Sequence, residues 1–129
     1  MKVKGTDEIL GGYNPLEWNN SYDGLLLKII WMETKDSFIF SLKNGTVQNS
    51  ILSRVKYIKR AIGNVSKTFQ NKYGPQFGDF YLYSEKFDFT LGENYCSIKG
   101  NNYEKPIRTS SSPNFPIVNY EVFKIVRKS

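Results

Sequence analysis

A segment rich in glycine and proline near the start of the chain limits its fold more than any other feature. Residues 11–18 read Gly-Gly-Tyr-Asn-Pro-Leu-Glu-Trp, and residues 34–42 read Thr-Lys-Asp-Ser-Phe-Ile-Phe-Ser-Leu. Glycine admits positive φ, whereas proline fixes its own φ and biases Asn14 away from helix. The first run therefore predicts a turn followed by a buried Trp18, and the second run predicts a strand.

Length and composition indicate a single folded domain. The chain has 129 residues, of which 40% are apolar and 16% aromatic, too many for a disordered chain and favourable for strands. No apolar run approaches the roughly 18 to 20 residues that span a bilayer, and residues 1–7 lack the apolar centre of a secretory signal. One cysteine cannot form an internal disulfide. These features predict a soluble, cytoplasmic protein without a membrane span.

The absence of histidine excludes several kinds of active site. A chain without imidazole has no Ser-His-Asp triad, no Cys-His pair and no histidine-based zinc site. The sequence also lacks a phosphate loop, a dinucleotide fingerprint and a calcium loop. Asp79, Glu85, Asp88 and Glu93 form the densest acidic group, which we interpret as a solvated loop. Cys96 is expected to be a small buried residue in a strand, so the sequence predicts no cofactor and no metal.

Positive charge is concentrated in the middle of the chain. The net charge is +6, yet no acidic residue occurs between Asp36 and Asp79. The basic residues of that window are Lys43, Arg54, Lys56, Lys59, Arg60, Lys67 and Lys72. The window is either a soluble face that repels its copies or a surface for an acidic partner, which is a protein, an anionic membrane or a nucleic acid. Nucleic acid is disfavoured because the aromatic residues do not alternate with the basic ones.

Short runs of β-forming residues separated by turn residues predict a mainly β (α+β) fold, a sandwich of two antiparallel sheets with few flanking helices. Strands are expected at residues 37–42, 51–57, 60–65, 80–83, 95–98 and 120–126, with turns at 44–45, 74–75 and 100–102 and a loop at 110–113. Residues 48–62 also fit an amphipathic helix. The alternation in residues 37–42 places Phe38, Phe40 and Leu42 on one face, which we predict to be core together with Val122.

Several of these motifs, taken in order, resemble the TLDc domain, and most closely its fungal branch. The resemblance rests on residues 11–18 and 34–42, and on residues 74–79, 103–107 and 120–123. It supports strands over a helix within residues 48–62. It also implies a non-enzymatic module that binds and regulates the vacuolar proton-pumping ATPase and contributes to oxidative-stress resistance.

Two departures from the family pattern stand out. The family's domain usually begins with a helix and a strand upstream of Val3, so residues 1–129 are expected to form a single, incomplete domain. Residues 25–32, Leu-Leu-Leu-Lys-Ile-Ile-Trp-Met, replace a short polar loop. This apolar insert is a strand or helix that covers the gap, a partner-binding surface, or a translated intron.

The sequence also suggests which residues meet a partner. Our partner-binding candidates are Gly11, Gly12, Tyr13, Asn14, Arg54, Lys56, Lys59, Arg60, Gly78 and Asp79. The leading hypothesis is protein binding, with the vacuolar ATPase as the implied partner. The alternatives are an enzyme that pairs the carboxylates of Glu17 and Asp79, and a basic nucleic-acid-binding domain.

Overall fold

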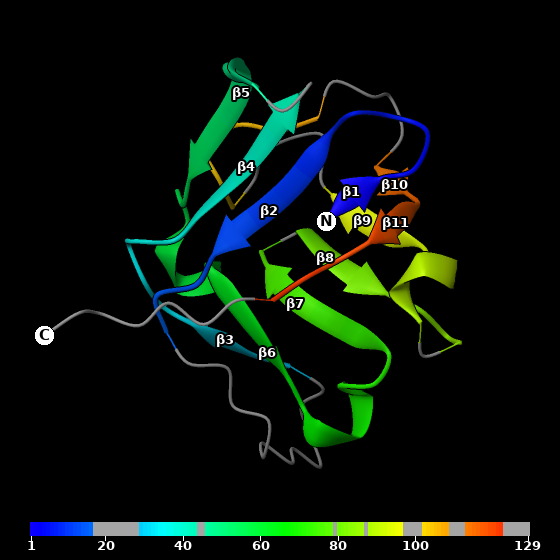
Figure 1. The fold of residues 1–129 in the computed structure, drawn as a ribbon. Helices are drawn as coiled ribbons and strands as arrows, with labels where there is room; N and C mark the ends of the chain where they lie inside the picture. Colours follow the sequence, from blue (N-terminus) through cyan, green and yellow to red (C-terminus); the bar gives the residue numbers. More distant parts are fainter. Residues whose placement is uncertain are drawn as a thin grey trace, which may run out of the picture.

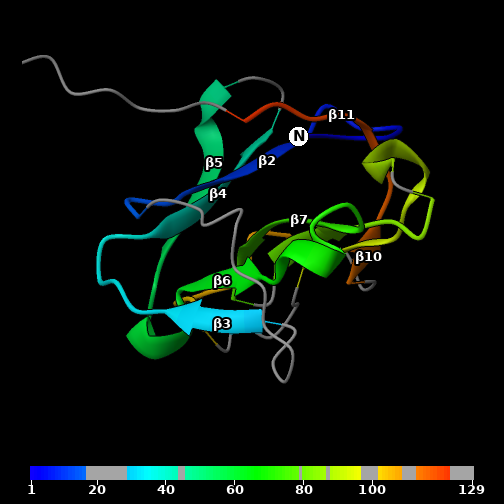
Figure 2. The same cartoon turned by 90° about the horizontal axis from the view of Figure 1, so that it is seen from below.

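Two antiparallel β-sheets pack face to face as two layers in this computed structural model (Figures 1 and 2). The structure describes residues 1–16, 29–43, 46–78, 80–86, 88–96, 102–108 and 113–122, with the side chains of residues 46–49 and 67 excepted. In Figure 2 the first sheet is the upper layer and the second the lower. The predicted mainly β sandwich is confirmed.

The first sheet has five strands in the order β11-β1-β2-β4-β5. Its strands are β1 (Lys2–Val3), β2 (Ile9–Tyr13), β4 (Phe38–Lys43), β5 (Thr46–Arg54) and β11 (Ile117–Asn119). The second sheet has six strands in the order β10-β9-β8-β7-β6-β3. Its strands are β3 (Ile29–Met32), β6 (Ile62–Val65), β7 (Tyr73–Phe77), β8 (Phe80–Tyr83), β9 (Asn94–Cys96) and β10 (Asn114–Phe115).

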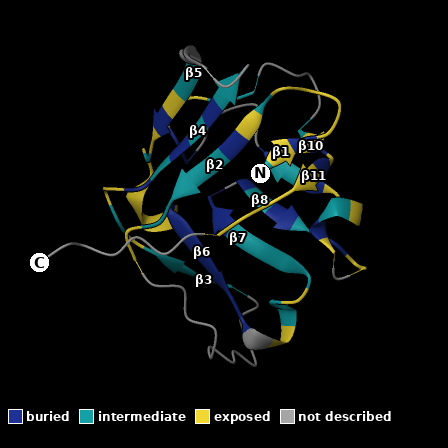
Figure 3. Ribbon diagram, viewed as in Figure 1, coloured by how far each residue is buried: buried dark blue, intermediate teal, exposed yellow. Residues whose placement is uncertain are grey.

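The core lies between the inner faces of the two sheets. Leu10 and Ile39 of the first sheet belong to the same buried cluster as Ile62, Phe80 and Leu82 of the second. Strand β6 is buried along its whole length (Figure 3). Cys96 is also part of this cluster, in β9, which confirms the prediction of a buried cysteine in a strand.

Most of the predicted strands are present, with shifted ends. Residues 37–42, 80–83 and 95–98 match β4, β8 and β9. The helix that the apolar spacing of residues 48–62 allowed is absent, and β5, a 3-10 turn η1 (Ile58–Arg60) and β6 occupy this segment. Two further 3-10 turns, η2 (Lys67–Phe69) and η3 (Phe89–Leu91), complete the helical structure of the described residues. The expected turns at 44–45 and 100–101 and the loop at 110–112 lie outside the described residues.

The end of the chain differs from the prediction. The strand expected at residues 120–126 is wrong for residues 120–122, because β11 ends at Asn119. Residues 123–126 lie outside the described residues. Ile117 of β11 pairs with Val3 and both side chains are buried, whereas Val122 is 63% exposed. Val122 is therefore not a core residue. The Tyr120 ring packs edge-on against Phe89, with centroids 5.1 Å apart.

The predicted inner face of β4 is also wrong. Ile39 and Ser41 are buried, whereas Phe38, Phe40 and Leu42 are only half-buried. Alternation separates two faces of a strand but does not say which face meets the other sheet. Here Ser41 and Ser53 occupy buried inner positions, and Ser53 Oγ donates to the carbonyl oxygen of Lys105 (2.7 Å).

The glycine and proline motifs lie within strands more than in turns. Gly11 and Gly12 belong to β2, and the turn starts only at Asn14, whose Oδ1 accepts a hydrogen bond from the Leu16 amide (2.8 Å). Residues 74–75 likewise lie in β7, where the pairing with β8 shifts register. Such an irregular position tolerates a proline that lacks an amide donor. Trp18 lies outside the described residues.

Candidate functional site

Four strand ends and the segment 102–105 meet at one end of the sandwich, around the buried side chain of Tyr103. The Tyr103 hydroxyl donates to the carbonyl oxygen of Ala61 (2.8 Å) and lies 2.6 Å from Ser37 Oγ. Ser37 Oγ in turn donates to the carbonyl oxygen of Tyr13 (2.9 Å). Burial raises the pKa of Tyr103 to about 12, so the hydroxyl keeps its hydrogen at physiological pH. Four segments distant in sequence, at Tyr13, Ser37, Ala61 and Tyr103, are thereby fixed to each other.

Backbone hydrogen bonds attach the loop after β5 to the same segment. The amides of Lys56 and Tyr57 both donate to the carbonyl oxygen of Asn102, at 2.9 and 3.0 Å. The Glu104 amide donates to the carbonyl oxygen of Arg54 (2.9 Å). Because the main chain supplies these contacts, the side chains of residues 56–60 are free to point outward.

Every side chain from residue 56 to residue 60 is exposed. Lys56, Lys59 and Arg60 are basic, and between them Tyr57 and Ile58 are 49% and 39% exposed. The Arg60 guanidinium also lies over the Trp31 ring of β3, 5.4 Å from its centroid. We name residues 56–60 the basic loop; it offers both positive charge and apolar surface to a partner.

The structure brings together six of the ten partner-binding candidates. Arg54 and Lys56 share backbone hydrogen bonds with the segment 102–104, and Gly78 contacts Asn102 of that segment. Arg60 precedes Ala61, which is bonded to Tyr103. Tyr13 reaches Tyr103 through Ser37, and Asn14 follows Tyr13 in the chain. Gly78 has a positive φ of 59°, and a Cβ there would lie 2.8 Å from the Asn102 Cβ. Lys59 lies on the basic loop beside Arg60. Asp79 is outside the described residues.

Gly11 and Gly12 allow two aromatic rings to pack closely against β2. A Cβ on Gly11 would overlap the Phe40 ring, and a Cβ on Gly12 would lie 2.8 Å from the Phe77 ring. Both glycines lie where a ring approaches the backbone closely. Neither has a positive φ, so the turn that the sequence suggested for them is wrong. The missing side chains make room for one aromatic ring on each face of β2.

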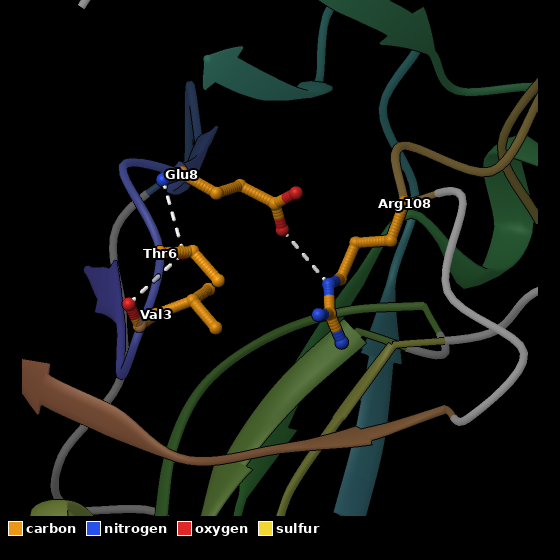
Figure 4. Close-up of polar contacts among 4 residues, drawn as sticks. All are labelled: Val3, Thr6, Glu8 and Arg108. Carbon is orange, nitrogen blue, oxygen red and sulfur yellow. Dashed lines mark hydrogen bonds and ion pairs between the residues drawn. The ribbon is translucent and has the colours of Figure 1, made fainter. Parts of the chain in front are cut away.

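A partly buried ion pair is the main feature that the sequence did not reveal (Figure 4). Arg108 Nε lies 2.8 Å from Glu8 Oε1, and both side chains are 12% exposed. Thr6 Oγ1 accepts from the Glu8 amide and donates to the Val3 carbonyl oxygen, both at 3.0 Å, which fixes the loop that carries Glu8. The Arg108 guanidinium also lies 5.1 Å from the centroid of the Phe115 ring. The two charged residues are 100 positions apart, so no local pattern could have predicted the pair.

The described part of the chain contains no cluster of potential metal ligands. Within it, no group of three or more His, Cys, Asp or Glu residues is placed to hold a metal ion. Glu17 and Asp79, the carboxylates of the enzyme hypothesis, both lie outside it. The described residues also include no helix long and apolar enough to cross a membrane.

Comparison with known proteins gives one match. A family model, the TLDc domain, matches residues 1–126. No curated protein and no solved structure matches the chain.

Proposed function

This chain belongs to the TLDc domain family, and from that membership we propose that it is a non-catalytic protein-interaction module of the cytoplasm. Its proposed partner is the vacuolar proton-pumping ATPase, and its proposed cellular role is regulation of that pump and resistance to oxidative stress. The contact surface is the basic loop together with Arg54, Tyr13 and Asn14.

The exposure of the basic loop is the observation that carries this proposal. Three cations and two apolar side chains point outward in consecutive positions, on a backbone fixed by hydrogen bonds to Asn102. A fixed backbone reduces the ordering cost of binding, and exposed cations attract an acidic surface. Tyrosine and arginine are also common among residues that dominate interface energies.

The binding test uses the purified soluble sector of the vacuolar ATPase, immobilised, with this chain in solution. Reversing three charges (Lys56→Glu, Lys59→Glu, Arg60→Glu) is expected to weaken binding at least tenfold, and raising the salt concentration should weaken the wild type. Lys86→Glu, an exposed change on a different loop, is the matched control and should bind as the wild type does. Absence of wild-type binding, or equal binding by the triple variant, would contradict the proposal.

The cellular role is tested separately. Expression of the wild type in fungal cells that lack their own TLDc protein should restore growth in hydrogen peroxide, whereas the triple variant should not. Equal rescue by both chains would separate stress resistance from the basic loop. Binding assays with DNA and RNA complete the set, and tight, salt-sensitive binding there would favour the nucleic-acid alternative instead.

A further inference from the structure

The outer face of the first sheet is apolar over three neighbouring strands. Paired residues of adjacent strands point to the same side, as do residues two apart along one strand. The pairings place three rows on the outer face: Ile9 with Leu42, Gly11 with Phe40 and Leu52, and Tyr13 with Phe38 and Arg54. Apart from Arg54, every one of these residues is apolar, glycine or aromatic. We name this surface the outer face.

Aromatic rings make the outer face continuous. The Tyr13 and Phe38 rings have centroids 5.3 Å apart, and those of Phe38 and Phe40 are 6.5 Å apart. The Phe40 ring lies over Gly11, where a Cβ would overlap it. At the two sides of the rings, Ile9 is 38% and Leu52 is 44% exposed. Sandwich strands normally place polar residues outward, and a continuous apolar surface marks an interaction site.

Positive charge stands at two opposite corners of the outer face. Lys2 pairs with Ile9 at one corner, and Arg54 pairs with Phe38 at the other. The five strands of this sheet contain no Asp or Glu. Three strand spacings of about 4.8 Å and four residues of about 3.3 Å separate the two cations, which gives a diagonal of roughly 20 Å.

We propose that the outer face binds an amphipathic α-helix of a partner protein, with an apolar stripe and a carboxylate near each end. A helix of about 13 residues rises roughly 20 Å, and its diameter of about 10 Å matches the width of β2, β4 and β5. The carboxylates would meet Lys2 and Arg54. This inference rests on the proposed role as an interaction module and adds the chemistry of the partner segment.

Charge favours a helix of another protein over a second copy of this chain. Two copies docked by the same face would be related by two-fold symmetry. Their apolar rows could meet, but the sheet strands contribute cations alone, so no carboxylate of those strands could neutralise Lys2 and Arg54. Like charges brought together at an interface oppose association. An acidic helix satisfies both the apolar rows and the corner cations.

The test measures binding of a designed peptide by fluorescence anisotropy. The probe is a fluorescein-labelled helix of about 14 residues, long enough to span the diagonal, with leucines on one stripe and a glutamate near each end of that stripe. A second peptide carries lysine in place of both glutamates. The wild-type chain is expected to bind the first peptide at least tenfold more tightly than the second, and more weakly at high salt.

Surface variants locate the binding site. Leu52→Ser and Arg54→Glu each change an exposed residue of the outer face and should weaken binding at least fivefold. Leu91→Ser and Lys86→Glu change exposed residues on other elements and serve as matched controls with wild-type affinity. Thermal unfolding of each variant excludes loss of fold as the cause. Changes of backbone amide resonances on adding the peptide should centre on β2, β4 and β5.

Three outcomes would overturn the inference. The first is that the wild type does not bind the glutamate peptide, and the second is that Leu52→Ser binds it as tightly as the wild type does. The third is that sedimentation shows a wild-type dimer that Leu52→Ser dissociates, because a second copy of the chain then occupies the outer face. Vesicle binding that Leu52→Ser abolishes, without peptide binding, would assign the face to a membrane surface. This assay contains no ATPase subunit. Failure to bind the peptide therefore does not contradict the proposed binding to the pump, and failure to bind the pump does not contradict binding of the helix.

Discussion

Gly12 and Gly11 are adjacent in β2 but are expected to respond differently to substitution. The Phe77 ring that faces Gly12 is in the core, whereas the Phe40 ring over Gly11 is on the outer face. Gly12→Ala should lower the free energy of unfolding by about 1–3 kcal/mol, because a buried ring has no room to shift. Gly11→Ala should cost clearly less, since a half-exposed ring can turn toward solvent.

Urea unfolding of both variants measures this difference. The Phe77→Leu background provides the control, because a smaller side chain should relieve most of the cost of Gly12→Ala. If Gly12→Ala costs as much in the Phe77→Leu background as it does in the wild type, the ring is not the cause.

The raised pKa of Tyr103 predicts how the stability of the chain depends on pH in the alkaline range. Its pKa is raised from 10.0 to about 12 in the folded chain by burial, whereas unfolded tyrosine ionises near about 10. Above about pH 10 the unfolded chain therefore loses the proton first, and the native chain binds more protons. The contribution of Tyr103 is complete below about pH 10 and is lost progressively toward about pH 12.

Tyr103→Phe should remove this part of the pH dependence. At about pH 8 the variant is expected to be less stable by about 1–3 kcal/mol, because the Ala61 carbonyl oxygen loses its donor. Between about pH 10 and pH 12 its stability should fall less steeply than that of the wild type in urea unfolding. Tyr120→Phe, at an exposed position, is the control and should keep the wild-type slope. A slope unchanged in Tyr103→Phe would refute this assignment.

At the scale of elements, β3 shows what half of the apolar insert does. Residues 29–32 form an edge strand that pairs with β6, and Met32 packs against the core. These four residues form a strand, while residues 25–28 lie outside the described residues. The three explanations for the insert stay predictions. The strand extends the second sheet, so it covers the side of β6 that would otherwise be an open edge.

The loss of stability caused by a substitution on β3 should therefore depend on which face of the strand it changes. Ile30 and Met32 alternate with Trp31, and Met32 lies opposite the fully buried Ile62. The double change Ile30→Ser and Met32→Ser should destabilise the chain by about 2–4 kcal/mol, because both side chains leave apolar surface uncovered. Trp31→Ser, on the outer side of the same strand, should cost less than half as much. Chemical unfolding measures both, and the reverse order would mean that β3 covers nothing in the core.

At the scale of the whole molecule, Cys96 can report the separation of the two sheets. Its side chain is 2% exposed within the core cluster. A thiol reagent should reach it only after global unfolding, so the labelling rate in water should be at least a hundredfold below that of the unfolded chain. The rate should rise with urea in parallel with the unfolding equilibrium. Fast labelling without urea would mean that the sheets separate locally.

A buried thiol is also a poor redox group, because burial in apolar surroundings disfavours the reactive thiolate. Hydrogen peroxide consumption by the wild type is therefore expected to equal that of Cys96→Ser. A loss of peroxide consumption in the variant would show redox catalysis by the Cys96 thiol.

The sequence by itself determined the fold class and the elements that local patterns encode. Ring-rich and β-branched runs predicted β4, β8 and β9, and the run without carboxylates predicted a basic surface that the structure displays at residues 54–60. Strand propensity and charge belong to neighbouring residues, so they can be read before the chain folds. The ordered motifs also led to the TLDc family, which the match over residues 1–126 confirmed.

Only the tertiary structure decided which residues meet. Alternation in β4 is symmetric, so packing against the second sheet had to choose Ile39 over Phe38 and Phe40 as the inner residue. The same packing set the place of Gly12 opposite Phe77 and joined Glu8 to Arg108 across 100 positions. The outer face likewise exists only through the register of β2, β4 and β5. Contacts of this kind depend on how distant segments are brought together, and no short run of the sequence carries that information.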